Sequence, residues 1–224
     1  MTARVVSVNT GRAAPDAHKP HQSTGIDKRP VASIEVFDPG PRRWVDGAGV
    51  SGVAGDFLGD GKHHGGDVQA VYAYAAEDLA HLSGVVGREF GPGQFGENLT
   101  TEGLDVTGAL IGERWRIGDA ELAVTTPRIP CNTFRAWIDE RGWLKTFTRE
   151  GRSGSYLRVI RPGVIRSGDP VEVVFKPDHA VTIGVLFRSQ TLERELAGLV
   201  LTAREYLDPE SIRIAERRET FELG

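Results

Sequence analysis

The chain has 224 residues, a net charge of −4 at neutral pH and 39% hydrophobic residues. This length allows one substantial core, and the charge excludes the broad basic surface typical of proteins that bind nucleic-acid polymers or anionic membranes. No stretch approaches the roughly 20 apolar residues that cross a bilayer, and residues 1–12 lack the pattern of an export signal. We therefore expect a soluble, cytoplasmic protein with no nucleic-acid or membrane partner.

Short runs of strand-forming residues recur through the first part of the chain, separated by glycine, proline, and Asp or Asn. This spacing predicts a β-barrel or sandwich rather than alternating βαβ units. Apolar residues at helical spacing predict helices at 75–82 and 134–141. The predicted strands are Val5–Val8, Val31–Val36, Val68–Tyr74, Leu122–Thr126, Leu157–Ile160 and Val171–Phe175.

The pattern changes after Lys176, where leucines such as Leu192 and Leu196 recur at helical spacing. Asp208 before Pro209 is typical of a helix N-cap followed by a first-turn proline. We predict a β domain over residues 1–178 and a small helical domain over 179–224. The helical part either covers one edge of the β domain or takes part in binding.

Two glycine-rich segments are candidates for phosphate binding. Gly91–Gly96 (GPGQFG) matches the dinucleotide pattern GxGxxG by letter, but Pro92 removes an amide and residues 97–101 predict a strand where that pattern needs a helix. We reject a Rossmann site there. In Gly55–Gly66 (GDFLGDGKHHGG), the adjacent glycines after Lys62 predict an anion nest of backbone amides with a cationic rim. The alternative is a plain surface loop.

A metal site built by protein side chains alone is not favoured, because neither His18 with His21 nor His63 with His64 converges on one point. The absence of a GxSxG motif gives no support to a serine hydrolase.

Cys131 is the single cysteine, which excludes an internal disulfide and is too few for an iron–sulfur cluster or a structural zinc site. A lone cysteine is most often a small buried hydrophobic residue. Here, however, it ends the segment Thr125–Cys131 (TTPRIPC), whose two prolines stiffen the turn. Arg128 would favour the thiolate, the form that binds metals and attacks electrophiles.

These motifs, in this order, resemble the MOSC-domain family and its bacterial YiiM-like branch over nearly the whole chain. The matching residues are Gly25-Ile26, Lys28, Pro30-Val31, residues 52–56 (GVAGD), Lys62, residues 64–66 (HGG), residues 95–99 (FGENL), Ile111-Gly112, Pro127-Arg128, Pro130-Cys131 and Gly168-Asp169. The resemblance implies a mainly β fold with added helices, a MOSC-type β-barrel followed by a small three-helix C-terminal domain.

The resemblance also implies the molybdenum cofactor (molybdopterin), with Cys131 as both the molybdenum ligand and the catalytic residue. Pyridoxal phosphate is not expected. Cationic groups and amides would neutralise the anionic tail of the cofactor, and two polar side chains would bond the pterin edge. The first set is Lys28, Arg29, Lys62, Arg128 and the amides of His64, Gly65 and Gly66; the second is Glu97 and Asn98.

The implied activity is reduction of small N-hydroxylated compounds, including hydroxylaminopurine-type bases and amidoximes. Electrons would come from an external donor, a flavoprotein, because the chain has no flavin fingerprint and one cysteine. Two other functions remain open: a cofactor or sulfur carrier without turnover, and a metal-free thiol enzyme.

Two departures from the family pattern stand out. Glu113 replaces the usual aspartate after Ile111-Gly112, and residues 34–49 show no family pattern. That stretch either lines the entrance to a site or only covers the β domain.

Overall fold

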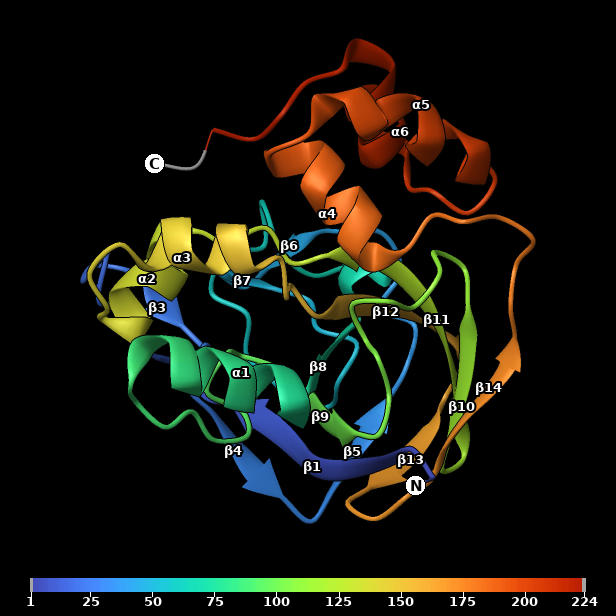
Figure 1. The fold of residues 1–224 in the computed structure, drawn as a ribbon. Helices are drawn as coiled ribbons and strands as arrows, with labels where there is room; N and C mark the ends of the chain where they lie inside the picture. The colour runs from blue at the N-terminus through green and yellow to red at the C-terminus, as the bar shows by residue number, and fades with distance from the viewer. Residues whose placement is uncertain (1, 223–224) are drawn as a thin grey trace.

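The computed structural model describes residues 2–222 and contains one large mixed sheet with helices on its outside (Figure 1). All neighbouring strands pair antiparallel except β8 and β9, which are parallel. In spatial order the sheet consists of β14 (Val171–Phe175), β10 (Arg114–Ile117), β11 (Ala120–Pro127), β12 (Ser155–Arg161), β8 (Val71–Ala75), β9 (Leu99–Glu102), β1 (Arg4–Gly11) and β4 (Lys28–Val31).

Three small ladders accompany this sheet. They are β13 (Gly163–Arg166) with β5 (Ser33–Val36), β2 (Ala14–Pro15) with β3 (Ser23–Thr24), and β6 (Trp44–Val45) with β7 (Ala48–Gly49). The predicted class, mainly β with added helices, is confirmed.

The strands do not close into the expected barrel. Among the described residues, the start of β1 meets the segment before β14 only through an isolated bridge between Arg4 and Pro170 and a few backbone hydrogen bonds around it. Pro170 has no N–H to donate, so a regular ladder cannot continue through this position. The sheet therefore has β14 and β4 as its two end strands.

Three helices pack around an aromatic cluster beside the sheet: α1 (Ala76–Val86), α2 (Asn132–Ile138) and α3 (Trp143–Glu150). Phe95 is fully buried at its centre, with its ring centroid 5.1 to 5.5 Å from those of Tyr74, Phe134 and Trp143. Edge-to-face pairs of this kind add stability beyond the area that they bury. The cluster fixes α2, the helix that begins directly after Cys131.

Helices alone make up the last part of the chain. They are α4 (Ile183–Thr191), α5 (Ala197–Val200) and α6 (Pro209–Arg217), with short 3-10 turns η2 (Arg194–Leu196) and η3 (Leu201–Ala203); a further turn, η1 (Asp67–Gln69), precedes β8. The predicted cap is confirmed, since the Asp208 carboxylate accepts hydrogen bonds from the amides of Glu210 and Ser211.

The helical part and the sheet share buried apolar side chains. Leu186 and Val200 belong to the same core cluster as Trp115 of β10, and Phe187 of α4 packs against Phe147 of α3. The division at residue 178 stays a prediction, and residues 223 and 224 of the predicted helical domain lie outside the described ones. No helix among residues 2–222 is long and apolar enough to cross a membrane.

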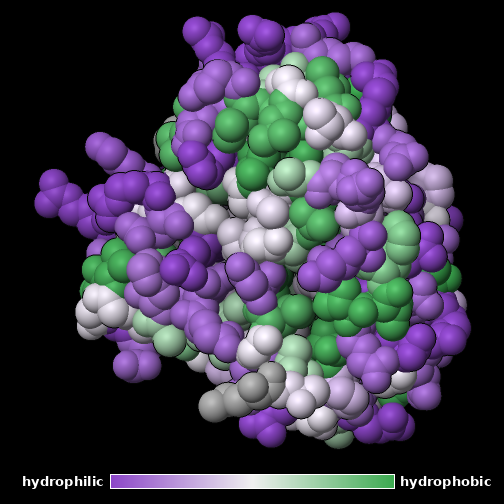
Figure 2. Space-filling model, turned by 45° about the vertical axis from the view of Figure 1, so that its right-hand side comes forward, coloured by the Kyte–Doolittle hydropathy of each residue, from purple (hydrophilic) through white to green (hydrophobic). Residues whose placement is uncertain are grey.

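Apolar side chains on one face gather over the C-terminal helices and over the edge formed by β14 and β10 (Figure 2). The exposed large hydrophobic residues there include Leu192, Leu199, Val173, Val174 and Phe175.

The shared core predicts that the whole chain unfolds in one transition. Phe187→Ala should lower the free energy of unfolding by about 3–5 kcal/mol, because a fully buried ring is lost from the contact between α4 and α3. Denaturant unfolding followed by fluorescence and circular dichroism measures this. Leu192→Ala, an exposed position on the same segment, is the control. Two separate transitions, with only one of them shifted, would contradict the prediction.

Candidate functional site

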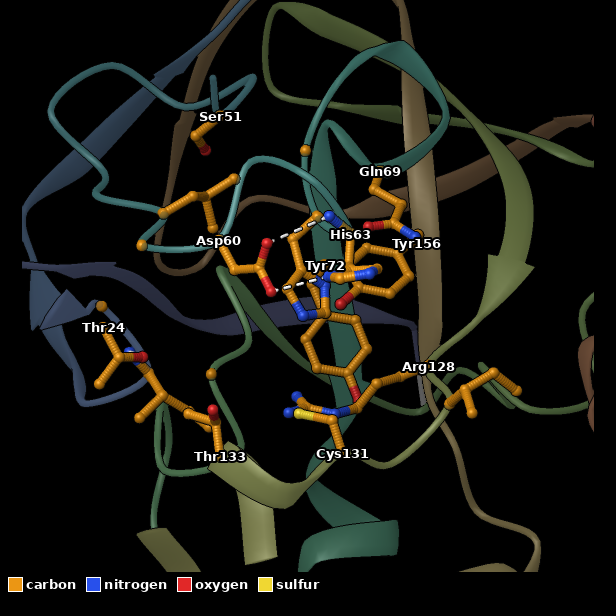
Figure 3. A pocket seen from close by; sticks show the side chains of 18 of the residues that line it. Thr24, Ser51, Asp60, His63, Gln69, Tyr72, Arg128, Cys131, Thr133 and Tyr156 are labelled. Atoms are coloured by element: carbon orange, nitrogen blue, oxygen red, sulfur yellow. Dashed lines mark hydrogen bonds and ion pairs between the residues drawn. The ribbon is translucent and has the colours of Figure 1, made fainter. Parts of the chain in front are cut away.

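One pocket with a volume of about 500 Å³ collects most of the predicted site residues (Figure 3). The loop between β2 and β3, the loop over residues 56–65, the turn over residues 126–133 and the C-terminal helices each contribute to its walls. Cys131, Arg128, His64, Gly65, Lys28 and Asn98 line it, whereas Arg29, Lys62, Gly66 and Glu97 do not.

Cys131 lies where β11 ends and α2 begins. Thr125 anchors the end of β11 through hydrogen bonds from its hydroxyl to the carbonyl oxygens of Val68 and Tyr156, at 2.6 and 2.9 Å. Cys131 then takes the N-cap position of α2, and its carbonyl accepts the amide of Arg135. Its side chain is half-buried: it packs against the aromatic cluster on one side and lines the pocket on the other, so it is not a fully buried core residue. The simple buried-cysteine interpretation is therefore wrong.

The environment of Cys131 stabilises its thiolate. Burial alone would raise the pKa of the thiol, but a hydrogen bond from His64 and the positive charge of Arg128 outweigh it and lower the pKa to about 6. Figure 3 shows the sulfur of Cys131 beside the guanidinium of Arg128. The thiolate form thus prevails at neutral pH, as the sequence predicted from Arg128.

Arg128 is a buried cation held by its own set of contacts. Its Nη1 donates to the Phe95 carbonyl at 2.6 Å, and its guanidinium lies 3.9 Å from the ring centroid of Phe134 and 5.5 Å from that of Tyr72. Burial lowers the pKa of the guanidinium, but the two pocket tyrosines and Cys131 more than offset this, and the net shift is upward. Its Nε is buried with no hydrogen-bond partner among the described residues.

The predicted anion nest at residues 64–66 is wrong. The amide of His64 donates to the Asp60 carbonyl and that of Gly66 to the Val50 carbonyl, so two of the three amides are already bonded. Gly65 and Gly66 have φ angles of 86° and 75°, and a Cβ at either would collide with the backbone of residue 50 or 42. These glycines allow close packing of loops, and this packing places the His64 side chain beside Cys131.

Two predicted cations stay at the surface. Arg29 pairs with Asp27 at 2.8 Å and is 75% exposed in its side chain, and Lys62 is exposed and outside the pocket lining. Their assignment to the pocket is therefore wrong. In a strand such as β4 consecutive side chains point to opposite faces, so Lys28 turns inward and Arg29 outward.

Lys28 and Asp56 form a buried ion pair at the base of the pocket. Their side chains are 4% and 1% exposed. Asp56 also accepts hydrogen bonds from the Gly11 amide at 2.7 Å and from Ser51 and Asn98, both at 3.0 Å. Burial lowers the pKa of Lys28, although the charge of Asp56 opposes this. A buried charge persists when it is paired and its remaining bonds are satisfied, as here.

The carboxylate of Glu97 bonds the protein rather than facing the pocket. It accepts hydrogen bonds from the amides of Gly93 and Phe95 and from the Thr100 hydroxyl. Its predicted role at the pterin edge is therefore wrong, and it instead fixes the turn at residues 91–96. Asn98 does line the pocket, but its side chain is already bonded to Asn9, Asp56 and Tyr72.

Several pocket residues went unnoticed in the sequence. Tyr72 and Tyr156 stack with ring centroids 4.8 Å apart, and the Tyr72 hydroxyl donates to the Ser153 carbonyl at 2.7 Å. Asp16 accepts a hydrogen bond from Thr133 at 2.7 Å and so ties the β2–β3 loop to the first turn of α2. Only Asp56 carried a signal, since it belongs to the GVAGD motif.

No group of three or more His, Cys, Asp or Glu side chains within residues 2–222 could hold a metal ion.

A family model decides the relationship: the MOSC domain matches residues 60–172, just over half of the chain. The chain belongs to the MOSC family. MOSC domains are associated with the molybdenum cofactor, and the function of this chain is of that class. The matched span contains Cys131, Arg128 and His64, but not Lys28 or the C-terminal helices.

The crystal structure of YiiM from Geobacillus stearothermophilus is similar, with a TM-score of 0.75 and 26% identity over 96% of this chain and 98% of that one. Protein YiiM of Escherichia coli (strain K12) is 32% identical over 131 residues, 55% of this chain and 56% of that protein. A protein named Reductase from Gibberella moniliformis is 30% identical over 132 residues, 57% of this chain but 23% of its own length. The chain is thus a YiiM-like MOSC protein that aligns with part of these two curated relatives.

The low pKa of Cys131 predicts strong reactivity at mildly acidic pH. Its rate of alkylation by iodoacetamide should rise with pH around a midpoint near 6, because the thiolate forms above this pKa. His64→Ala removes the hydrogen bond and should move the midpoint upward. His63→Ala is the matched control, since that ring pairs with Asp60 instead. A midpoint near that of an ordinary thiol in the unmodified chain would contradict the assignment.

The buried pair predicts a large loss of stability when one partner is removed. Asp56→Ala should cost about 3–5 kcal/mol in the free energy of unfolding, because Lys28 is left charged, buried and unpaired. Denaturant titration measures this loss. Asp27→Ala, which removes the partner of exposed Arg29, should change stability little. Equal effects of the two variants would show that the Lys28–Asp56 pair does not stabilise the fold.

Proposed function

We propose that this chain is a molybdenum-cofactor-dependent reductase of N-hydroxylated compounds, in which the Cys131 thiolate ligates the metal. The observation that carries the proposal is the position of this thiolate, partly exposed to a pocket of about 500 Å³ with Arg128 and His64 beside it. Family membership and the relative named Reductase support a reductive role.

The donor set of the pocket fits such a cofactor. A thiolate is a soft ligand suited to a metal already held by sulfur, and the pocket provides one thiolate and no competing cluster of hard ligands among the described residues. The unpartnered Nε of buried Arg128 is a donor that an anionic or carbonyl oxygen of a bound molecule would satisfy. Lys28 adds positive charge at the base, although Asp56 compensates much of it.

When bound, the cofactor supplies two-electron redox chemistry that no side chain can perform. The overall reaction takes R–NH–OH, two electrons and two protons to R–NH₂ and water. The protein holds and positions the groups that take part in this reaction. Cys131 is held in position as the residue directly before α2 and after the turn at Pro130, and His64 and Arg128 keep it deprotonated.

The pocket also orients the substrate. The stacked rings of Tyr72 and Tyr156 give one wall an aromatic surface, which suits flat substrates such as hydroxylaminopurine-type bases and aryl amidoximes. Gln69 lines the same pocket, and its Oε1 is a buried acceptor with no donor among the described residues. A substrate N–H would satisfy it.

Metal and pterin analysis tests the proposal. Protein from a molybdenum-sufficient host should contain nearly stoichiometric molybdenum and a fluorescent pterin after oxidation, and should reduce benzamidoxime with reduced methyl viologen as donor. Cys131→Ala should abolish this reduction, because the metal loses its protein ligand. The thermal unfolding of this variant should stay close to that of the unmodified chain.

Three results would contradict the proposal. Full activity of Cys131→Ala would remove the assigned role. Bound pterin without any reduction would instead favour a cofactor or sulfur carrier. A chain isolated without pterin, whose thiol is nonetheless catalytic, would indicate a metal-free thiol enzyme.

A further inference from the structure

The stretch without family pattern, residues 34–49, ends in an exposed hairpin directly after Arg42, a residue that lines the pocket. β6 and β7 are joined by Asp46 and Gly47, whose φ angles of 49° and 82° are both positive, as in the tight turns that fit the twist of a two-stranded hairpin. The hairpin is bonded to the neighbouring loop, since the Gly49 amide donates to the Leu58 carbonyl at 2.7 Å. It is therefore an ordered projection rather than a loose loop.

This hairpin exposes apolar surface that the fold does not need. Trp44 is 55% exposed and Val45 is 44% exposed. Tryptophan and arginine are the residues most enriched at the energetic centres of protein interfaces. Single exposed apolar residues are common, so Trp44 and Val45 indicate an interface only together with the charges around them.

Unpaired cations surround Trp44. Arg42 and Arg43 precede it directly, and Arg42 Nη1 donates to the Lys62 carbonyl at 3.4 Å, which brings Lys62 into the same area. All three are exposed, and none forms an ion pair with a described residue. Asp46 in the turn is the one acidic residue of the hairpin. Asp60, whose carboxylate accepts the Lys62 amide, pairs with His63, so three cations face two carboxylates in this area, and the local charge is positive on a chain with net charge −4.

The same segment reaches the pocket. Arg42 lines it together with Asp60 and His63 of the neighbouring loop, and the charge of Arg42 lowers the pKa of the Tyr156 hydroxyl, which burial raises. A protein seated on Arg43 and Trp44 would thus come close to the reactive centre. Electron transfer between proteins needs this closeness, because its rate falls steeply with distance.

From these observations we propose that Arg43, Trp44, Val45 and Lys62 form the docking surface for an acidic electron-transfer protein carrying a reduced flavin. The inference rests on the proposed function, which requires two electrons from outside the chain. The donor would lose them from its reduced flavin, and the N–O bond of the substrate would break with uptake of two protons to give amine and water. Complementary charge would mainly speed encounter, and the contact itself would be small.

The test compares a protein donor with a small one. Arg43→Glu and Trp44→Ala are assayed for benzamidoxime reduction with an acidic flavodoxin kept reduced by its NADPH-dependent reductase, and again with reduced methyl viologen. With flavodoxin at low salt, each variant should raise the KM for the donor about 10-fold, while the viologen-driven rate stays unchanged. The flavodoxin-driven rate of the unmodified chain should also fall as salt screens the charges.

Arg166→Glu is the matched control, because it makes the same charge change at an exposed arginine on β13 with no ion pair among the described residues. Arg43→Glu behaving like Arg166→Glu would overturn the inference. Calorimetry of flavodoxin binding tests the docking surface independently of turnover. Weaker binding of both hairpin variants supports it, and unchanged binding overturns it. Lack of viologen-driven reduction in the unmodified chain would instead count against the proposed function.

Discussion

The buried ion pair between Lys28 and Asp56 holds together the segments on which the pocket depends. Lys28 comes from β4, and the other groups that bond Asp56 come from the end of β1, the loop at residue 51 and the entry to β9. Removing two charges from water is costly, and only the complete set of partners offsets that cost. The four segments are thus fixed relative to one another, because displacing any of them would leave a buried charge or its neighbours unsatisfied.

Above this base, Arg128 connects structure with reactivity. The same guanidinium bonds the Phe95 carbonyl, lies over the Phe134 ring and stabilises the Cys131 thiolate. The aromatic cluster behind it therefore sets the position of a charge as well as supplying apolar burial. Because Phe95 and Phe134 are fully buried, that charge has little freedom to move away from the sulfur. The hydrogen bond from His64 and this rigid cation are together a physical basis for a thiolate that persists at neutral pH.

Local sequence patterns predicted the strands and the reactive turn well. The runs ending at Thr126 and Phe175 lie in β11 and β14, and the proline-stiffened turn does present Cys131 to a pocket. The run over residues 31–36 divides into β4 and β5, and the start of the run over 68–74 becomes η1, because tertiary pairing decides where such runs bend. Helix α3, which also packs on the aromatic cluster, was not predicted.

The assignments that failed depend on which groups bond one another, and residue types alone do not show this; the partners of Glu97 lie within four residues of it, whereas the Gly66 amide bonds the Val50 carbonyl. Lys62, Gly66 and Glu97 have residue types suited to an anion or a pterin. The amides of His64 and Gly66 and the carboxylate of Glu97, however, are already bonded within the protein, and the Lys62 side chain is at the surface. Asp56 belongs to the GVAGD motif, but the motif alone does not show which groups bond its carboxylate. Its importance comes from four partners spread over 87 residues of chain, from Gly11 to Asn98.

The C-terminal helices and the segment after them add one wall to the pocket, through residues that include Gln190, Ser211, Ile214 and Phe221. These residues lie outside the span 60–172 that defines family membership, whereas Cys131, Arg128 and His64 lie inside it. One wall of the pocket is therefore encoded in a different stretch of the gene from the reactive residues. Replacement or drift of the terminal helices would alter which molecules fit without disturbing the sulfur centre, a route by which one scaffold diversifies its choice of substrate.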